Sequence, residues 1–306
     1  MKSENNPKPF WNYIKSLRKG ANDLVLLREG NKEITDEYGI AEEMNNYFSS
    51  VFTKEQNNIP EFDNFMGDKL NNILCNANEV EHHLKELNAH KSQGPDLISP
   101  RILKECAREL STSLCTLFNK SFTSGLIPTE WKMANITPIY KMGDKLKKEN
   151  YRQVSLTSIA CKVAEKIVRS RVTAFWSEHQ VLNSHQFGYL KGKSTLAQLL
   201  SCFHDWSSSR NNSKITDVVF LDLSKAFDSV PHERLLLKLN KYGIDGPLLL
   251  WFRQFLTNRQ QRVGIRGTYS NWSAVTSVVP QGTILGPILF LIYVNDIPNI
   301  VKRASI

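Results

Sequence analysis

Residues Asp217–Pro231 read DVVFLDLSKAFDSVP, and this stretch decides how the rest of the chain is interpreted. Val218 to Leu221 form a short apolar run rich in residues that favour β-structure, which predicts a buried strand. Asp222 ends the run with a carboxylate, just before the chain turns. A carboxylate at the tip of a buried strand is a suitable metal ligand on a rigid element. The same aspartate equally suits a turn that caps the next helix, and this stretch alone supports both interpretations.

The composition indicates a globular protein with an anionic partner. The chain has 306 residues and a formal net charge of +9. It contains no apolar run of membrane-spanning length, and its first residues lack the apolar core of a secretion signal, so we expect no membrane partner. The five cysteines are scattered and form no CxxC pair. This spacing argues against zinc and against a disulfide framework, and it favours a reducing intracellular setting, nucleus or cytoplasm.

Residues 1–78 are expected to form an N-terminal connector that is partly helical. Trp11–Leu17 shows a short helical pattern, and apolar positions over 36–52 fall on one face of a longer helix. Residues 54–70 are polar and contain Pro60 and Gly67, which predicts a linker.

Beyond residue 78 the apolar periodicity alternates between helix and strand. Helices are expected at 80–90, 100–121, 161–175, 232–242, 247–256 and 286–296, and a further helix opens at Ser194 or Thr195. Strands are expected at 136–140, 154–156 and 261–265. His82 and His83 point in different directions on a helix, which favours a solvated face over a metal site.

The two strands around residue 145 enclose a basic loop. Lys141 begins it and Arg152 follows its end. Lysine offers a point charge and arginine a forked donor, so such a hairpin suits a triphosphate. Taken alone, the loop is better explained as a solvated basic turn. Arg262 and its neighbours Arg259 and Arg266 suit a phosphate backbone and a solvent-facing position equally well.

Two further blocks combine glycine with functional side chains. Residues 185–195 read HQFGYLKGKST, in which aromatics alternate with lysines as in segments that stack on a nucleic-acid strand. Its Lys-Gly-Lys-Ser does not meet the spacing of a phosphate-binding P-loop. Residues 279–297 read VPQGTILGPILFLIYVNDI. Gly282 permits close backbone approach to a ligand, and Gln281 offers both a donor and an acceptor. Alone, this block is most simply a turn before a core helix.

Six blocks in order carry a family resemblance: GPD (94–96), W…ITPIYK (131–141), NYRQVSL (150–156), HQFGYLKGKST (185–195), FLDLSKAFDSV (220–230) and VPQGTILGPILFLIYVNDI (279–297). From about residue 80 onward, the chain resembles the reverse transcriptase of non-LTR (LINE-type) retrotransposons of the jockey or CR1-like branch. The resemblance implies an α+β fold, with the fingers and a partial palm of a right-hand polymerase. The palm would be a split βαβ unit with an antiparallel sheet, and the thumb would be absent. The reverse transcriptase domain would span 79–306, with fingers at roughly 79–210 and palm at roughly 211–306.

The same resemblance assigns roles to individual residues. It implies metal binding by Asp222 and by the backbone carbonyl of Leu223. It implies nucleotide binding by Lys141, Arg152, Phe227, Gln281 and Gly282. Asp228 belongs to the motif and is expected to be structural. The cofactor would be Mg²⁺ in a two-metal site, and the partners an RNA template, a DNA primer and deoxynucleoside triphosphates.

Two departures from the family pattern qualify this expectation. Gln153 stands where the family usually has proline, which is expected to loosen the backbone beside Arg152. The acidic-pair hairpin expected soon after Pro298 does not occur, and Asp296 cannot replace it. The chain is therefore expected to be truncated before that hairpin and inactive, with a non-catalytic nucleic-acid-binding remnant as the alternative. A third interpretation is an unstable fragment in which apolar faces such as Ile288–Val294 are uncovered.

Overall fold

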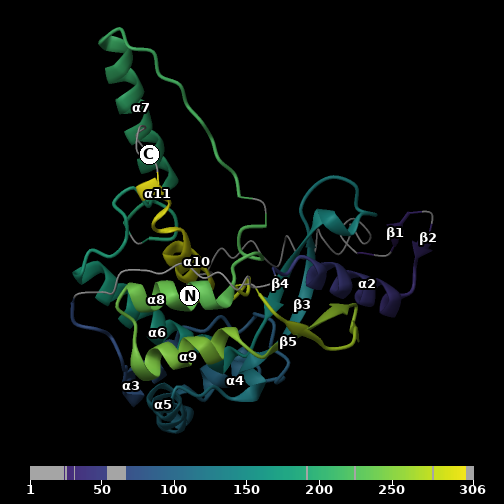
Figure 1. Ribbon diagram of the computed structural model, residues 1–306. Coiled ribbons are helices and arrows are strands. Elements are labelled where there is room, and N and C mark those ends of the chain that lie inside the picture. Colours follow the sequence, from purple (N-terminus) through teal and green to yellow (C-terminus); the bar gives the residue numbers. More distant parts are fainter. Residues whose placement is uncertain are drawn as a thin grey trace, which may run out of the picture.

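The protein is described by a computed structural model that covers residues 24, 26–30, 32–53, 67–190, 192–223, 225–277 and 279–300. It is an α+β structure in which a helical body adjoins a five-stranded mixed sheet (Figure 1). The helical pattern at Trp11–Leu17 and most of the expected linker lie outside the described residues. None of the described helices has both the length and the apolar character needed to cross a bilayer.

The helices are α2 (Glu37–Ser50), α3 (Ala77–Lys85), α4 (Pro100–Glu105), α5 (Ala107–Ser124), α6 (Ile159–Glu178), α7 (Thr195–Asn211), α8 (His232–Lys241), α9 (Gly246–Leu256), α10 (Gly286–Val294) and α11 (Ile297–Ile300), with 3₁₀ turns η1 (Thr129–Lys132) and η2 (Lys148–Asn150). The strands are β1 (Leu27–Glu29), β2 (Lys32–Ile34), β3 (Met133–Tyr140), β4 (Tyr151–Leu156), β5 (Arg259–Ile265), β6 (Thr268–Tyr269) and β7 (Ser273–Val275). The long helix expected at 100–121 is interrupted at Cys106, where α4 ends and α5 begins.

The main sheet has the strand order β4-β3-β5-β6, and β7 also pairs with β5. β3 and β4 form an antiparallel hairpin in which Ile136 lies opposite Ser155. β3 and β5 run parallel, with Asn135 opposite Arg262. The sheet is therefore mixed: β5 pairs antiparallel with β6 and β7, within the region expected to form the palm, and parallel with β3 of the expected fingers. A crossover that contains α6, α7, α8 and α9 separates β4 from β5, and such long connections allow parallel pairing.

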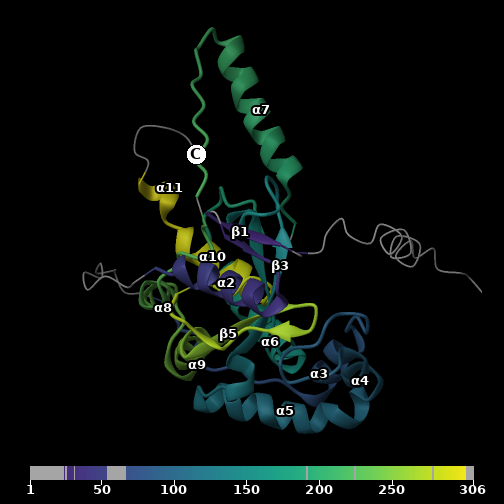
Figure 2. The ribbon, with the colours of Figure 1, turned by 90° about the vertical axis from the view of Figure 1, so that its right-hand side faces the viewer.

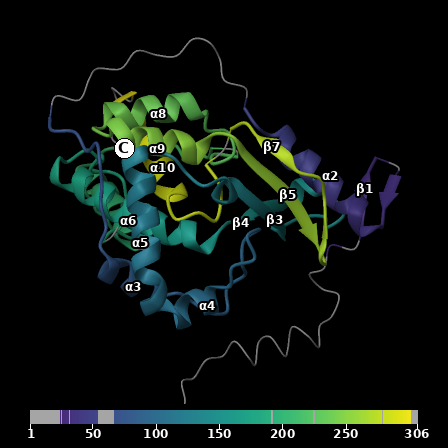
Figure 3. The ribbon, with the colours of Figure 1, turned by 90° about the horizontal axis from the view of Figure 1, so that it is seen from below.

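One face of the sheet is covered by α2 (Figure 3). The Asp36 side chain caps this helix by accepting a 2.6 Å hydrogen bond from the backbone N–H of Gly39. Ile40, Met44 and Phe48 are buried together with Ile136 of β3 and other residues of the sheet. The segment expected to be a connector thus contributes a helix to the core of the sheet, while the domain boundary at residue 78 stays a prediction.

The larger core lies among the helices. It joins α3, α5 and α6 to α8, α9 and α10, and Trp176 and Trp251 are among its fully buried side chains (Figures 2 and 3). The expectation that Ile288–Val294 would be uncovered is wrong for most of this segment. Ile288 and Ile292 of α10 are buried in this core because α8 and other helices pack against it.

Residues 195–223 form an arm that stands out from the helical body (Figures 1 and 2). It consists of α7 and an extended return segment without assigned strand structure. The buried strand expected over Val218–Leu221 is therefore wrong: Val219, Phe220 and Leu221 are 79%, 85% and 84% exposed. The physical reason is that a strand needs a neighbouring strand to pair with. In the described part of the chain no strand runs beside this segment, so its backbone groups lack a ladder and its side chains lack a covering layer.

Candidate functional site

The turn that contains Gln281 and Gly282 docks on the open edge of β4. The backbone N–H of Ser155 donates a 2.8 Å hydrogen bond to the carbonyl oxygen of Gln281. Gly282 has a φ of +104°, and a Cβ atom at this position would lie 2.7 Å from the carbonyl oxygen of Ser155. Only glycine fits this conformation and this contact. The close approach expected at Gly282 is thus made to the protein's own strand.

Beneath this turn, Asp228 links the turn to the same strand. Its Oδ1 accepts hydrogen bonds from the side-chain amides of Gln153 at 3.0 Å and Gln281 at 2.8 Å. Its backbone carbonyl accepts one from the hydroxyl of Ser277 at 3.2 Å. Gln153, expected to loosen the backbone, is instead 4% exposed and held inside β4. These contacts agree with the structural role expected for Asp228.

The carboxyl group of Asp228 is electrostatically unusual. Burial raises its pKa above the ordinary value for aspartate, although the amides of Gln153 and Gln281 and the charge of Lys225 act in the opposite direction. The folded state therefore binds the proton of Asp228 more tightly than the unfolded chain does. Stability that depends on this group is fully present at low pH and is lost as the pH rises through the raised pKa.

We predict that Asp228→Asn removes this pH dependence. The difference in unfolding free energy, wild type minus variant, should decrease by on the order of 1 kcal/mol as the pH rises through the raised pKa. Urea unfolding at several values between pH 4 and pH 7 measures it. The matched control is Asp205→Asn, since Asp205 is exposed on α7. A difference that stays constant over this range would contradict the prediction.

Phe227 is positioned by aromatic contacts from two other blocks. Its ring stacks on Phe290 of α10 with 4.5 Å between centroids, and Tyr189 approaches it edge-on at 6.3 Å. Its backbone carbonyl accepts a 3.0 Å hydrogen bond from the N–H of Val279. Residues that lie far apart in the sequence therefore meet around one aromatic ring.

Glu165 anchors the other end of the turn, although it is not among the site residues predicted from the sequence. This residue of α6 is fully buried, and its Oε2 accepts hydrogen bonds from the N–H groups of Ile284 and Leu285 at 2.6 and 3.0 Å. Burial raises the pKa of Glu165, and these two donors and the buried Arg259 oppose the shift. The sequence feature that could have identified Glu165 is its position, because it places a carboxylate inside an apolar stripe. This stripe includes Val163, Ala164, Ile167 and Val168.

Lys141 and Arg152 lie on the same face of the β3–β4 hairpin. Arg152 is opposite Ile139, and the backbone N–H of Lys141 donates to the carbonyl of Asn150 at 2.8 Å. Both basic side chains are exposed. Because side chains alternate along a strand, they lie on the face opposite that of Gln153. The hairpin therefore joins a basic outer face to an inner face that holds Asp228.

Asp222 and Leu223 are not brought to the hairpin. Both are exposed on the extended part of the arm. Within the described residues, one group of three side chains has potential metal-ligand atoms that all lie within 4.8 Å of one another. It consists of His82, His83 and Glu86 and does not include Asp222. One exposed carboxylate with a neighbouring carbonyl does not fit a site for two divalent cations, which needs several oxygen ligands.

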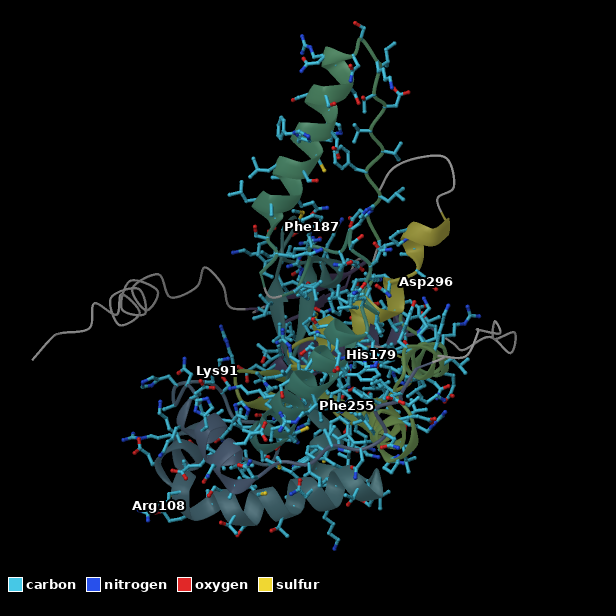
Figure 4. All side chains as sticks on the ribbon, turned by 90° about the vertical axis from the view of Figure 1, so that its left-hand side faces the viewer. Lys91, Arg108, His179, Phe187, Phe255 and Asp296 are labelled. Carbon is cyan, nitrogen blue, oxygen red and sulfur yellow. The ribbon has the colours of Figure 1, made fainter. Side chains whose placement is uncertain are left out.

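A basic groove of about 1290 Å³ runs along α6 and the segment 180–193. Its cationic side chains are those of Lys166, Arg169, Lys193 and Lys241. Lys193 also lies over the ring of Phe187, 4.8 Å from its centroid, and Figure 4 places Phe187 at the base of the arm. The combination of aromatic and basic residues expected over 185–195 is therefore present, with Lys191 outside the described residues.

These features define a protein in which a glycine turn docks on the edge of a basic hairpin, residues of three sequence blocks meet at the ring of Phe227, and a basic groove runs along α6. A family model for reverse transcriptase (RNA-dependent DNA polymerase) matches residues 140–305, which include β4, the arm and the turn. The chain belongs to the reverse transcriptase family.

Its relatives identify the branch. The chain is 30% identical over 221 residues to the probable RNA-directed DNA polymerase from transposon BS of Drosophila melanogaster. It is 28% identical over 222 residues to the corresponding proteins of the X-element and of the mobile element jockey from the same organism. Each match covers 72% of this chain and 24% of the relative. The resemblance to reverse transcriptases of jockey-like non-LTR retrotransposons is confirmed, and the chain spans about a quarter of the length of these relatives.

Proposed function

We propose that this chain forms the fingers and part of the palm of an RNA-directed DNA polymerase of a mobile element. Its partners would be an RNA template, a DNA primer and deoxynucleoside triphosphates. The observation that carries the proposal is the docking of the Gln281–Gly282 turn on β4, since it joins two blocks of the family pattern, 150–156 and 279–297, at one place. Membership of the family supplies the class of reaction.

In this proposal the basic face of the hairpin holds the incoming triphosphate. Lys141 and Arg152 supply positive charge on one face, and phosphate oxygens form charge-assisted hydrogen bonds with such groups. Phe227, held against Phe290, would be the aromatic beneath the sugar. The Gln281–Gly282 turn would contact the nucleotide from the edge of β4.

Magnesium belongs to the proposal as the ion that this family typically uses. The candidate ligands in this chain are Asp222 and the carbonyl of Leu223. Since this donor set does not fit two cations, no catalytic step is assigned to it, and we expect the polypeptide alone to incorporate no nucleotide.

The test is the binding of a labelled RNA template annealed to a DNA primer, followed by fluorescence anisotropy. We expect binding that weakens steeply with salt, because each released counterion contributes to the affinity. The next complementary deoxynucleoside triphosphate, added with Mg²⁺, should strengthen binding about tenfold, which is the effect of one to two charge-assisted contacts. A mismatched nucleotide should have no such effect.

The double variant Lys141→Ala/Arg152→Ala should bind the template–primer and lose the effect of the complementary nucleotide. The matched control is Arg108→Ala/Lys120→Ala, which removes the same charge from the exposed face of α5. Figure 4 shows Arg108 far from Phe187 and the base of the arm. Absence of template–primer binding at low salt, or an equal loss in both double variants, would overturn the assignment.

A second candidate function is non-catalytic binding of single-stranded nucleic acid. It is favoured by the exposed position of Asp222 and by the basic groove beside α6. This function predicts salt-dependent RNA binding that does not respond to any nucleotide. The complementary-nucleotide arm of the experiment therefore separates the two functions.

A further inference from the structure

The fold brings together two cysteines that are 40 positions apart in the sequence. Cys75 precedes α3, and Cys115 lies in the middle of α5. Their sulfur atoms are 3.9 Å apart, and the thiol of Cys115 also contacts the backbone carbonyl of Cys75 at 3.3 Å. Both thiols are free. A disulfide requires a sulfur–sulfur distance of about 2.05 Å, so a side-chain adjustment of roughly 2 Å separates this pair from a bond.

Asn119 holds the backbone at Cys75 in place. Its Oδ1 accepts a 2.8 Å hydrogen bond from the N–H of Cys75, and its Nδ2 donates a 2.9 Å bond to the carbonyl of the same residue. Since Asn119 follows Cys115 by one helical turn on α5, the helix that carries one thiol also fixes the position of the other. The two sulfurs therefore meet in a defined geometry.

We propose that Cys75 and Cys115 form a redox site that closes to an intramolecular disulfide when the protein meets a peroxide. The spacing of the cysteines does not predict such a pair. The proposed redox site is independent of the proposed polymerase function.

The two thiols take different parts in the reaction. Cys75 is buried, and burial together with Cys115 raises the pKa of its thiol to about 12, which makes it a poor first nucleophile. Cys115 is only half-buried, so it reacts first. Its thiolate attacks one oxygen of hydrogen peroxide, the O–O bond breaks, and the leaving hydroxide takes a proton to form water.

The second step joins the two residues. Cys75 loses its proton and attacks the sulfur of the Cys115 sulfenic acid. The S–S bond forms, the S–O bond breaks, and the departing hydroxide takes a proton to give a second water. Two thiols and one peroxide thus yield one disulfide and two waters.

The disulfide would link α5 to residues 70–75. This segment also contacts α9 and the turn between α8 and α9. The N–H of Leu70 donates to the carbonyl of Gly243 at 2.8 Å, and the N–H of Leu248 donates to the carbonyl of Asn71 at 3.0 Å. Oxidation therefore fixes a junction where three parts of the helical body meet. Since the closed loop is long, we expect Tm to rise by roughly 5 °C and to return on reduction.

The test treats the folded chain with hydrogen peroxide and maps peptides without reduction. The background variant Cys106→Ser/Cys202→Ser removes the exposed and half-buried thiols that would pair between molecules. We expect one linked peptide pair, containing Cys75 and Cys115, and a mass loss of two hydrogens per chain. In Cys75→Ser, dimedone should trap sulfenic acid at Cys115, and in Cys115→Ser it should not label Cys75.

If these serine variants fail to give a folded circular dichroism spectrum, Cys75→Ala and Cys115→Ala provide the same comparison without a buried hydroxyl. The proposal is overturned if the linked peptide is absent while Cys106 of the unmodified chain is oxidised. It is also overturned if the link forms only in denaturant, because the native geometry would then not be its cause.

Discussion

Glu165→Ala should lower the free energy of unfolding by about 3 kcal/mol, since it leaves two buried backbone donors without an acceptor. The carboxylate of Glu165 accepts from Ile284 and Leu285 at the start of α10. Arg259 is also buried nearby, and burial lowers its pKa, while the charge of Glu165 acts in the opposite direction. Removal of the carboxylate thus leaves a less balanced cation in the core.

Urea unfolding of two further variants tests whether the loss of stability in Glu165→Ala comes from the lost hydrogen bonds to Ile284 and Leu285. Glu178→Ala changes an exposed glutamate on the same helix and should cost less than about 0.5 kcal/mol. Glu165→Gln keeps an oxygen that can accept from both amides and loses only the charge, so it should recover roughly half of the lost stability. A loss below about 1 kcal/mol in Glu165→Ala would contradict the anchoring role.

Gly282→Ala should destabilise the protein by about 3 kcal/mol and displace the turn from β4. Two effects add here: alanine is strained at a φ of +104°, and its Cβ would lie 2.7 Å from the carbonyl oxygen of Ser155. Backbone atoms of a paired strand do not yield as a flexible side chain does. The hydrogen bond from Ser155 to Gln281 should therefore be lost together with the close packing of the turn against β4.

Gly267→Ala is the matched control because Gly267 has a φ of +93°, and a Cβ atom added there would meet nothing within 4 Å. Gly267→Ala should lower the free energy of unfolding by the backbone strain alone, about 1–2 kcal/mol. Thermal or urea unfolding measures both variants. Equal losses in the two would mean that the contact with β4 adds nothing. The complementary-nucleotide effect on template–primer binding should disappear only in Gly282→Ala, since only that variant moves Gln281.

Much of the local structure could be predicted from periodicity. The apolar faces expected at 36–52, 161–175 and 232–242 correspond to α2, α6 and α8, each within a few residues at its ends. Helices of this kind are defined by residues three or four positions apart, so their pattern is visible within a short window. The family blocks were recognisable for the same reason, because each is short and their order is preserved.

Predictions that depended on distant partners were less successful. Val218–Leu221 has the composition of a buried strand, but a strand forms only where a neighbour completes its hydrogen bonds, and the described residues supply none there. The parallel pairing of β3 with β5 and the burial of α10 likewise follow from how the helices pack around the sheet.

The order of short motifs along the chain was enough to determine the family and the helical pattern, since both are written in neighbouring residues. Only the tertiary structure decided that Gln281 and Gly282 rest on β4, that Glu165 holds the start of α10, and that two scattered cysteines touch. Each of these contacts joins segments separated by tens of residues or more. Their energy depends on burial and on the closeness of groups that the linear sequence keeps apart.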